Sequence, residues 1–79
     1  MKTLVLPAIH ILVFKTDIRF DKDMPEVEQV MASLPDIQKW NVDHHDVDNI
    51  LRIEASNLIS EEIISAMQHA GFICIELED

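Results

Sequence analysis

Metal-binding side chains are concentrated in one short stretch, residues 41–49, which reads NVDHHDVDN. Histidine nitrogens and carboxylate oxygens are both ligands of divalent metals, and zinc and nickel accept such mixed ligand sets. Aspartate and asparagine also favour turns, because their short side chains hydrogen-bond to nearby backbone groups. The stretch therefore has two interpretations, a solvated turn and a metal site. The candidate ligands are Asp43, His44, His45 and Asp46.

The arrangement of these candidates favours the turn. Neighbouring side chains of a strand point to opposite faces, so only alternate members of the set could bind one ion together. Another loop would then have to supply a further ligand. The sequence contains no HExxH or HxxxH motif and no calcium-loop spacing. We therefore expect no bound cofactor, and weak zinc or nickel binding is the alternative.

The composition describes a small acidic domain. The chain has 79 residues, of which 48% are hydrophobic, and its formal net charge is −9. This length predicts a single domain over residues 1–79 with a small core. The negative charge disfavours nucleic acid and anionic membranes as partners, whereas it permits a metal cation or a basic protein. The only cysteine, Cys74, excludes an internal disulfide and a cysteine-based zinc site, which favours a reducing compartment and hence the cytoplasm.

The first residues are interpreted as a lead-in to the folded core. The opening MKTLVLPAIHILVF resembles a signal peptide, with one lysine before an apolar run. However, His10 interrupts that run, no small-residue cleavage site follows it, and it is too short to span a bilayer. We expect residues 1–8 to be a lead-in segment and residues 9–78 to form the core.

Hydrophobic periodicity predicts six elements. Alternating apolar residues indicate strands, and apolar residues at helical spacing indicate helices. The strands are expected over 9–18, 37–44, 49–56 and 72–78, and the helices over 24–34 and 61–70. Asp23 is the expected N-cap of the first helix, and Glu26 three residues later completes a capping-box pattern.

This βαββαβ order predicts an α+β fold, the ferredoxin-like sandwich. In that fold a four-stranded antiparallel sheet carries two helices on one face. Its topology brings three loops to the same end of the sheet, and these are residues 19–23, 43–48 and 69–72. The candidate metal ligands would therefore belong to a larger acidic end of the molecule.

Four segments of the chain carry a family resemblance: FKTDI, VEQVMASL, WNVDHHDVDNILRIE and AGFICIEL. They resemble the heavy-metal-associated (HMA) domain family, the fold of small copper chaperones and of the N-terminal domains of metal-pumping ATPases. The family binds soft metals with a CxxC motif just after the first strand. Aligned through KTDI, the resemblance places those two cysteine positions at Phe20 and Asp23, so the thiolate site is missing here.

The sheet face away from the helices is expected to be apolar, although a solvent-facing sheet face normally alternates to polar residues. Either residues 1–8 or another molecule should therefore cover it. We predict a homodimer through this face or through the edge strand of the sheet, unless residues 1–8 cover the face, with another protein as the alternative partner. The expected interaction face is Ile11, Val13, Ile50, Ile73 and Ile75.

No catalytic constellation is visible in the sequence. It shows no nucleophile with a base at recognisable spacing and no glycine-rich phosphate loop. We therefore expect a non-enzymatic, HMA-like binding or interaction domain that has lost the thiolate site. The alternative is a metal-ion-binding protein that uses aspartate and histidine ligands at the loop end.

Overall fold

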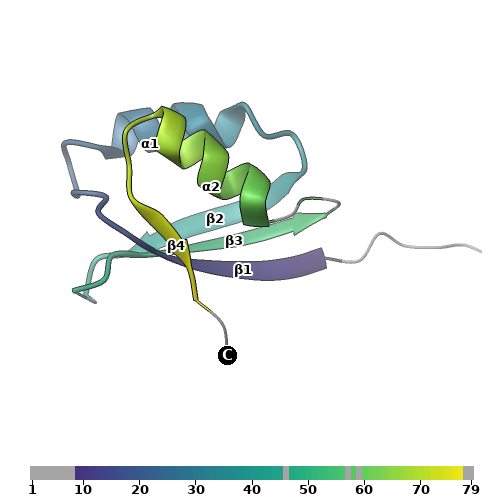
Figure 1. Cartoon of the computed structure of the whole chain (residues 1–79), viewed down its shortest axis with the longest axis horizontal. Coiled ribbons are helices and arrows are strands. Elements are labelled where there is room, and N and C mark those ends of the chain that lie inside the picture. The colour runs from purple at the N-terminus through teal and green to yellow at the C-terminus, as the bar shows by residue number, and fades with distance from the viewer. Residues whose placement is uncertain (1–8, 46, 57, 59, 78–79) are drawn as a thin grey trace, which may run out of the picture.

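The structure, a computed structural model, describes residues 9–45, 47–56, 58 and 60–77. The lead-in segment 1–8 therefore lies outside the described residues. The elements are β1 (Ile9–Thr16), α1 (Met24–Ala32), β2 (Ile37–Asp43), β3 (Ile50–Ser56), α2 (Ser60–His69) and β4 (Cys74–Glu76). All strand pairs are antiparallel, and both helices lie over one face of the sheet (Figure 1). The predicted ferredoxin-like fold is confirmed.

The sheet has the strand order β2-β3-β1-β4, so β1 and β3 are its central strands. The β2–β3 hairpin is a local pairing, whereas β1 pairs with strands that follow much later in the chain. All four strands are shorter than predicted, β2 and β3 by one residue each and β1 and β4 by more. β1 ends at Thr16 rather than at Ile18, and β4 pairs with β1 only over Cys74–Glu76.

The core lies between the sheet and the two helices. Alternate sheet residues such as Phe14, Leu51 and Ile53 point toward the helices and are fully buried, as the period-two pattern predicts. They pack against the apolar stripes of the helices, which supply Val27, Met31, Ile63 and Met67. Apolar burial of this kind is the main favourable contribution to folding.

The end of α2 is a tight glycine turn. Gly71 has a φ of 93°, in the left-handed region that favours glycine. Its N–H donates to the carbonyl of Gln68, and the N–H of Phe72 donates to the carbonyl of Met67, which is the Schellman arrangement. This turn reverses the chain and places Phe72 and the start of β4 beside the end of β1.

The open face of the sheet is divided into an apolar and a polar half. The register places Ile11 opposite Glu54, Val13 opposite Arg52, and Lys15 opposite Ile75. Ile50 pairs with Asp43 and is only partly exposed, so it is not a cross-strand neighbour of Ile11 as the sequence suggested. The apolar half lies over β1 and the segment that contains β4, and consists of Ile9, Ile11, Val13, Ile73, Ile75 and Leu77.

Neither of the two described helices is long and apolar enough to cross a membrane.

Candidate functional site

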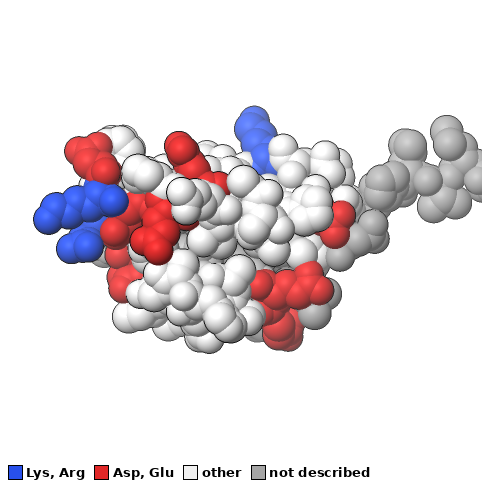
Figure 2. Space-filling view, turned by 90° about the horizontal axis from the view of Figure 1, so that it is seen from above, with Lys and Arg blue, Asp and Glu red and all other residues white. Residues whose placement is uncertain are grey.

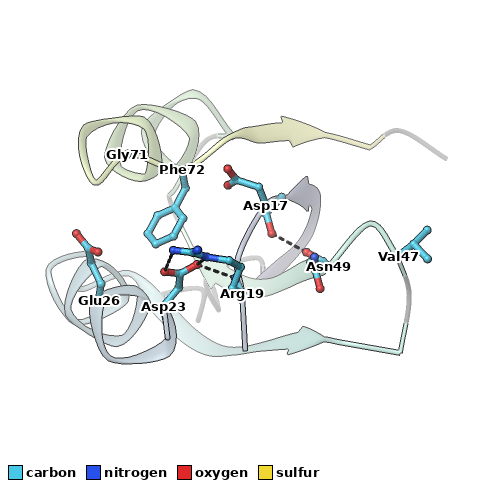
Figure 3. Close-up of a pocket in the computed structure, with 9 residues that line it drawn as sticks. Asp17, Arg19, Asp23, Glu26, Val47, Asn49, Gly71 and Phe72 are labelled. Atoms are coloured by element: carbon cyan, nitrogen blue, oxygen red, sulfur yellow. Dashed lines mark hydrogen bonds and ion pairs between the residues drawn. The ribbon is translucent and has the colours of Figure 1, made fainter. Parts of the chain in front are cut away.

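Three loops meet at one end of the sheet, as the topology predicts. They are the segments after β1, between β2 and β3, and after α2, and with the start of α1 they enclose an open cleft of about 650 Å³. Figure 3 shows the side chains that line it. The lining residues are Thr16, Asp17, Arg19, Asp23, Glu26, Val47, Asn49, Gly71 and Phe72.

Thr16 joins the end of β1 to the β2–β3 loop. Its N–H donates to the carbonyl of Asp48 (3.1 Å), and its hydroxyl donates to the carbonyl of Asn49 (2.6 Å). The same hydroxyl oxygen accepts the N–H of Ile18 (3.2 Å), which bends the chain out of the strand. Asn49 has a φ of 44°, a left-handed conformation that asparagine tolerates. These bonds hold two of the three loops together.

Asp23 does not cap α1, which corrects the predicted capping box with Glu26. Asp23 precedes the helix but has helical dihedral angles and makes no side-chain cap hydrogen bond. Its carboxylate instead accepts the backbone N–H of Arg19 (2.7 Å) and the Nε–H of the same residue (3.2 Å). The hydrogen bonds from Arg19 hold the pKa of the Asp23 carboxyl below its usual value. Arg19, four residues earlier, therefore binds the carboxylate that the capping pattern assigned to the N-terminus of α1.

Asp17 joins the loop after α2 to the end of β1. One of its carboxylate oxygens accepts the backbone N–H of Ile73 at 2.8 Å, just before β4 begins. The cleft thus contains three carboxylates, from Asp17, Asp23 and Glu26, and one guanidinium, which is already paired. The described residues that line it include no thiol and no imidazole. The chemistry available there is hydrogen bonding and ion pairing.

The predicted metal ligands of the β2–β3 loop are arranged as a turn. Asp43 Oδ1 accepts the backbone N–H of His45 at 2.9 Å, which is the local bond of an aspartate turn. His45 is exposed, and Asp46 lies outside the described residues. Among the residues that the structure describes, no three His, Cys, Asp or Glu side chains gather closely enough to hold a metal ion.

His44 instead packs against Phe20 in a tilted ring contact, with ring centroids 4.3 Å apart and planes 57° apart. Nδ1 of His44 is enclosed and has no hydrogen-bond partner, whereas the Phe20 side chain is 59% exposed. The contact joins the loop after β1 to the β2–β3 loop. Nothing in the sequence indicated this contact, because the two rings come from separate loops and match no short-range pattern.

Cys74 is a buried thiol in the folded protein. It faces the core, is 4% exposed, and makes no disulfide. Burial raises the pKa of the Cys74 thiol from 9.0 to about 12, because the apolar surroundings disfavour the charged form. The thiolate is the nucleophile and the metal ligand, so the folded chain holds this sulfur in an unreactive form.

We expect Cys74 to react with a colorimetric disulfide reagent only as fast as the chain unfolds. Well below pH 9 the thiol is protonated in both states and has no effect on stability. Between pH 9 and about 12 the unfolded thiol ionises and the folded one does not, so stability should fall as pH rises. Urea unfolding at several pH values measures this fall. A Cys74→Ala variant should lose the part of this fall that comes from the thiol. An identical pH dependence of stability in both proteins would contradict the raised pKa of Cys74.

The comparison with known proteins rests on the fold. No family model matches the sequence, and no curated protein does either. Solved structures with this architecture include the N-terminal domain of ZntA in its apo form. It has a TM-score of 0.77 and 19% sequence identity, over 90% of this chain and 96% of that one. They also include the apo HMA domain of the copper chaperone for superoxide dismutase. Its TM-score is 0.75 with 13% identity, over 99% of this chain and 76% of that one.

The chain has an HMA-like fold. The expectation of an HMA-like fold is therefore confirmed, while identities below one fifth describe the fold alone. A CxxC motif needs two cysteines, and this chain has one, which is buried in β4. The HMA-like fold is here present without a thiolate pair.

Proposed function

We propose that this chain is a non-enzymatic interaction domain that uses the HMA-like scaffold for protein contact and no longer for binding soft metals. We place it in the cytoplasm, because its one thiol is free and buried and needs no oxidising compartment. The observation that carries the proposal is the apolar half of the open sheet face. Its most exposed members are Ile11 at 63%, Ile9 at 59% and Ile73 at 57%.

The occupant that we propose for this face is a second copy of the chain. Fully burying an isoleucine side chain contributes roughly 1.5–3 kcal/mol, against which association has its own entropic cost. Four isoleucines of the patch are more than half exposed on each copy, namely Ile9, Ile11, Ile73 and Ile75. The free energy gained by burying these side chains in a dimer is large enough to oppose the entropic cost of association.

The charge distribution supports self-association at this face despite the net charge of −9. The paired strands present three basic side chains there and only two acidic ones, which the register places on the face together with Ile11 and Val13. The basic residues are Lys15, Lys39 and Arg52, and the acidic ones are Asp43 and Glu54. Most of the acidic residues lie elsewhere, so repulsion between two sheet faces is small and is screened further by salt.

Light scattering after size exclusion tests the proposal. We expect the wild type to have the mass of a dimer at high concentration and Ile11→Lys to have the mass of a monomer, because a charge at the centre of the apolar half would be buried unpaired. The matched control is Asn41→Lys, which places the same side chain on the polar half of the same face. This variant should remain dimeric.

Far-ultraviolet circular dichroism should be unchanged in both variants, because neither position contributes to the core. A wild type that stays monomeric at high concentration would overturn the homodimer. Equal dissociation by both lysine substitutions would mean that the contact does not depend on the apolar half.

A further inference from the structure

The strand β1 is paired along most of its length on one side only. β3 pairs with residues Ile9 to Phe14 on that side, whereas β4 pairs with Phe14 to Thr16 on the other. One further bond, from the N–H of Leu77 to the carbonyl of Val13 (2.8 Å), continues the β4 side. Within the described residues no strand lies beside residues 9–12 there. This part of β1 is an open strand edge, and Figure 1 shows β1 continuing past the place where β4 leaves it.

The unpaired backbone groups of this edge can be assigned from the register. Because the Val13 carbonyl points toward the β4 side, the alternation of a strand directs the N–H and C=O groups of Ile11 to the same side. The groups of His10 and Leu12 point toward β3. A free row of donors and acceptors is matched by another extended backbone, which is how proteins bind peptides by strand addition.

The two sides of the edge differ in chemistry. On the open sheet face it is bordered by the exposed side chains of Ile9 and Ile11. On the helix side lies a hollow of about 330 Å³ whose apolar part is formed by Leu12 and Leu58. The other residues that line this hollow are His10, Ser60, Glu61 and Glu76. The carboxylate of Glu76 accepts the hydroxyl hydrogen of Ser60, and Glu61 is exposed at the start of α2.

A strand added to this edge would send alternate side chains to these two sides. Those on the open face would meet isoleucine, so apolar residues fit there. Those on the helix side would pass over Leu12 and Leu58 and end near Glu61 and Glu76. Lysine and arginine suit that path, because their alkyl stems cover apolar surface while their charged ends reach the carboxylates. In Figure 2 the helical face shows acidic side chains without basic neighbours at the end away from the loop cleft.

We propose that the free edge of residues 9–12 binds an extended segment of a partner protein in which lysine or arginine alternates with apolar residues. The partner adds as a strand to β1 beyond the end of β4, and its basic side chains lie in the hollow between β1 and the start of α2. The site shares Ile9 and Ile11 with the proposed homodimer face, so peptide binding is measured at protein concentrations at which the chain is monomeric.

The test uses the full chain and a labelled seven-residue peptide, Thr-Ile-Lys-Val-Lys-Ile-Thr, followed by fluorescence anisotropy. We expect saturable 1:1 binding that weakens as salt is added. A peptide of the same composition with its lysines adjacent should bind at least tenfold more weakly, because it cannot separate basic from apolar side chains. N-methylation of the three central residues should abolish binding, because it removes backbone donors.

Two matched variants locate the site. Glu61→Lys should weaken binding about tenfold, because it reverses the charge at the hollow, whereas Glu62→Lys, one position along the same helix and outside the hollow, should have little effect. Amide resonances of residues 9–12 should shift on titration, and that of Lys39 should not. Equal affinity for the two peptide sequences, or equal effects of the two variants, would overturn the proposal.

Because the homodimer would also cover Ile9 and Ile11, peptide binding should weaken as protein concentration rises, whereas absence of binding where the chain is monomeric would overturn the proposal. The homodimer is measured by mass and the peptide site by anisotropy at low protein concentration. Failure of one can therefore be distinguished from failure of the other.

Discussion

Introducing two cysteines by Phe20→Cys and Asp23→Cys should give the chain a tight 1:1 Cu(I) site that the wild type lacks. The substitutions create a CxxC sequence in the turn just before α1, where the helix N-terminus favours thiolates. Paired thiolates are the soft ligands that select Cu(I), so the affinity should rise by several orders of magnitude. Anaerobic competition against a colorimetric Cu(I) chelator measures the change.

Neither position belongs to the hydrophobic core. Phe20 is 59% exposed. Asp23 would lose its ion pair with Arg19 and the hydrogen bond from the Arg19 backbone N–H. Phe20→Cys alone and Asp23→Cys alone each supply one thiolate and should bind Cu(I) weakly. These two single variants are the controls for the double variant. The wild type with Cys74→Ser should behave like the wild type. A double variant that binds no Cu(I) would show that Phe20 and Asp23 do not occupy the metal-ligand positions of the HMA-like fold.

Phe14→Ala should cause one of the largest losses of stability of any single substitution in the chain. Phe14 is fully buried at the centre of β1, and truncation of such a side chain costs about 3–5 kcal/mol. A domain of this length has roughly 4–12 kcal/mol of total stability, so the substitution removes a large share of it. Urea unfolding followed by the fluorescence of Trp40, which is partly buried against the core, measures the loss.

Phe20→Ala is the matched control for this prediction. It removes the same side chain from a position that is 59% exposed and contacts only the ring of His44 among aromatic neighbours. Its cost should be within about 1 kcal/mol, as for most surface substitutions. Similar losses from the two variants would mean that Phe20 carries packing that its exposure does not reveal.

The sequence predicted the fold because its core pattern is regular. The strand segments predicted from their apolar residues contain Phe14, Leu51 and Ile53, which all point to the buried face, since a strand has a period of two. The meeting of three loops at one end followed from topology alone. For both the buried strand faces and the position of the loops, local sequence patterns agree with the overall fold.

The details of the site could not be predicted in the same way. Asp23 had two possible partners, the helix N-terminus and Arg19, and only the geometry of the turn decides between them. The contact of Phe20 with His44 joins two loops and has no periodic signal. The short length of β4 was also hidden, because the sequence from Phe72 onward alternates like a longer strand.

The pairing of β1 has a consequence for the order in which the chain folds. Its cross-strand partners lie far along the chain, since Ile9 pairs with Ser56 and Thr16 with Cys74. The β2–β3 hairpin and the helices depend on nearby residues and can form early, but closing the loops that bring β1 to its neighbours has an entropic cost. On the ribosome, the first strand to emerge is therefore the last to be completed. Until β4 has been synthesised, the side of β1 that it pairs with is open to pairing with other chains.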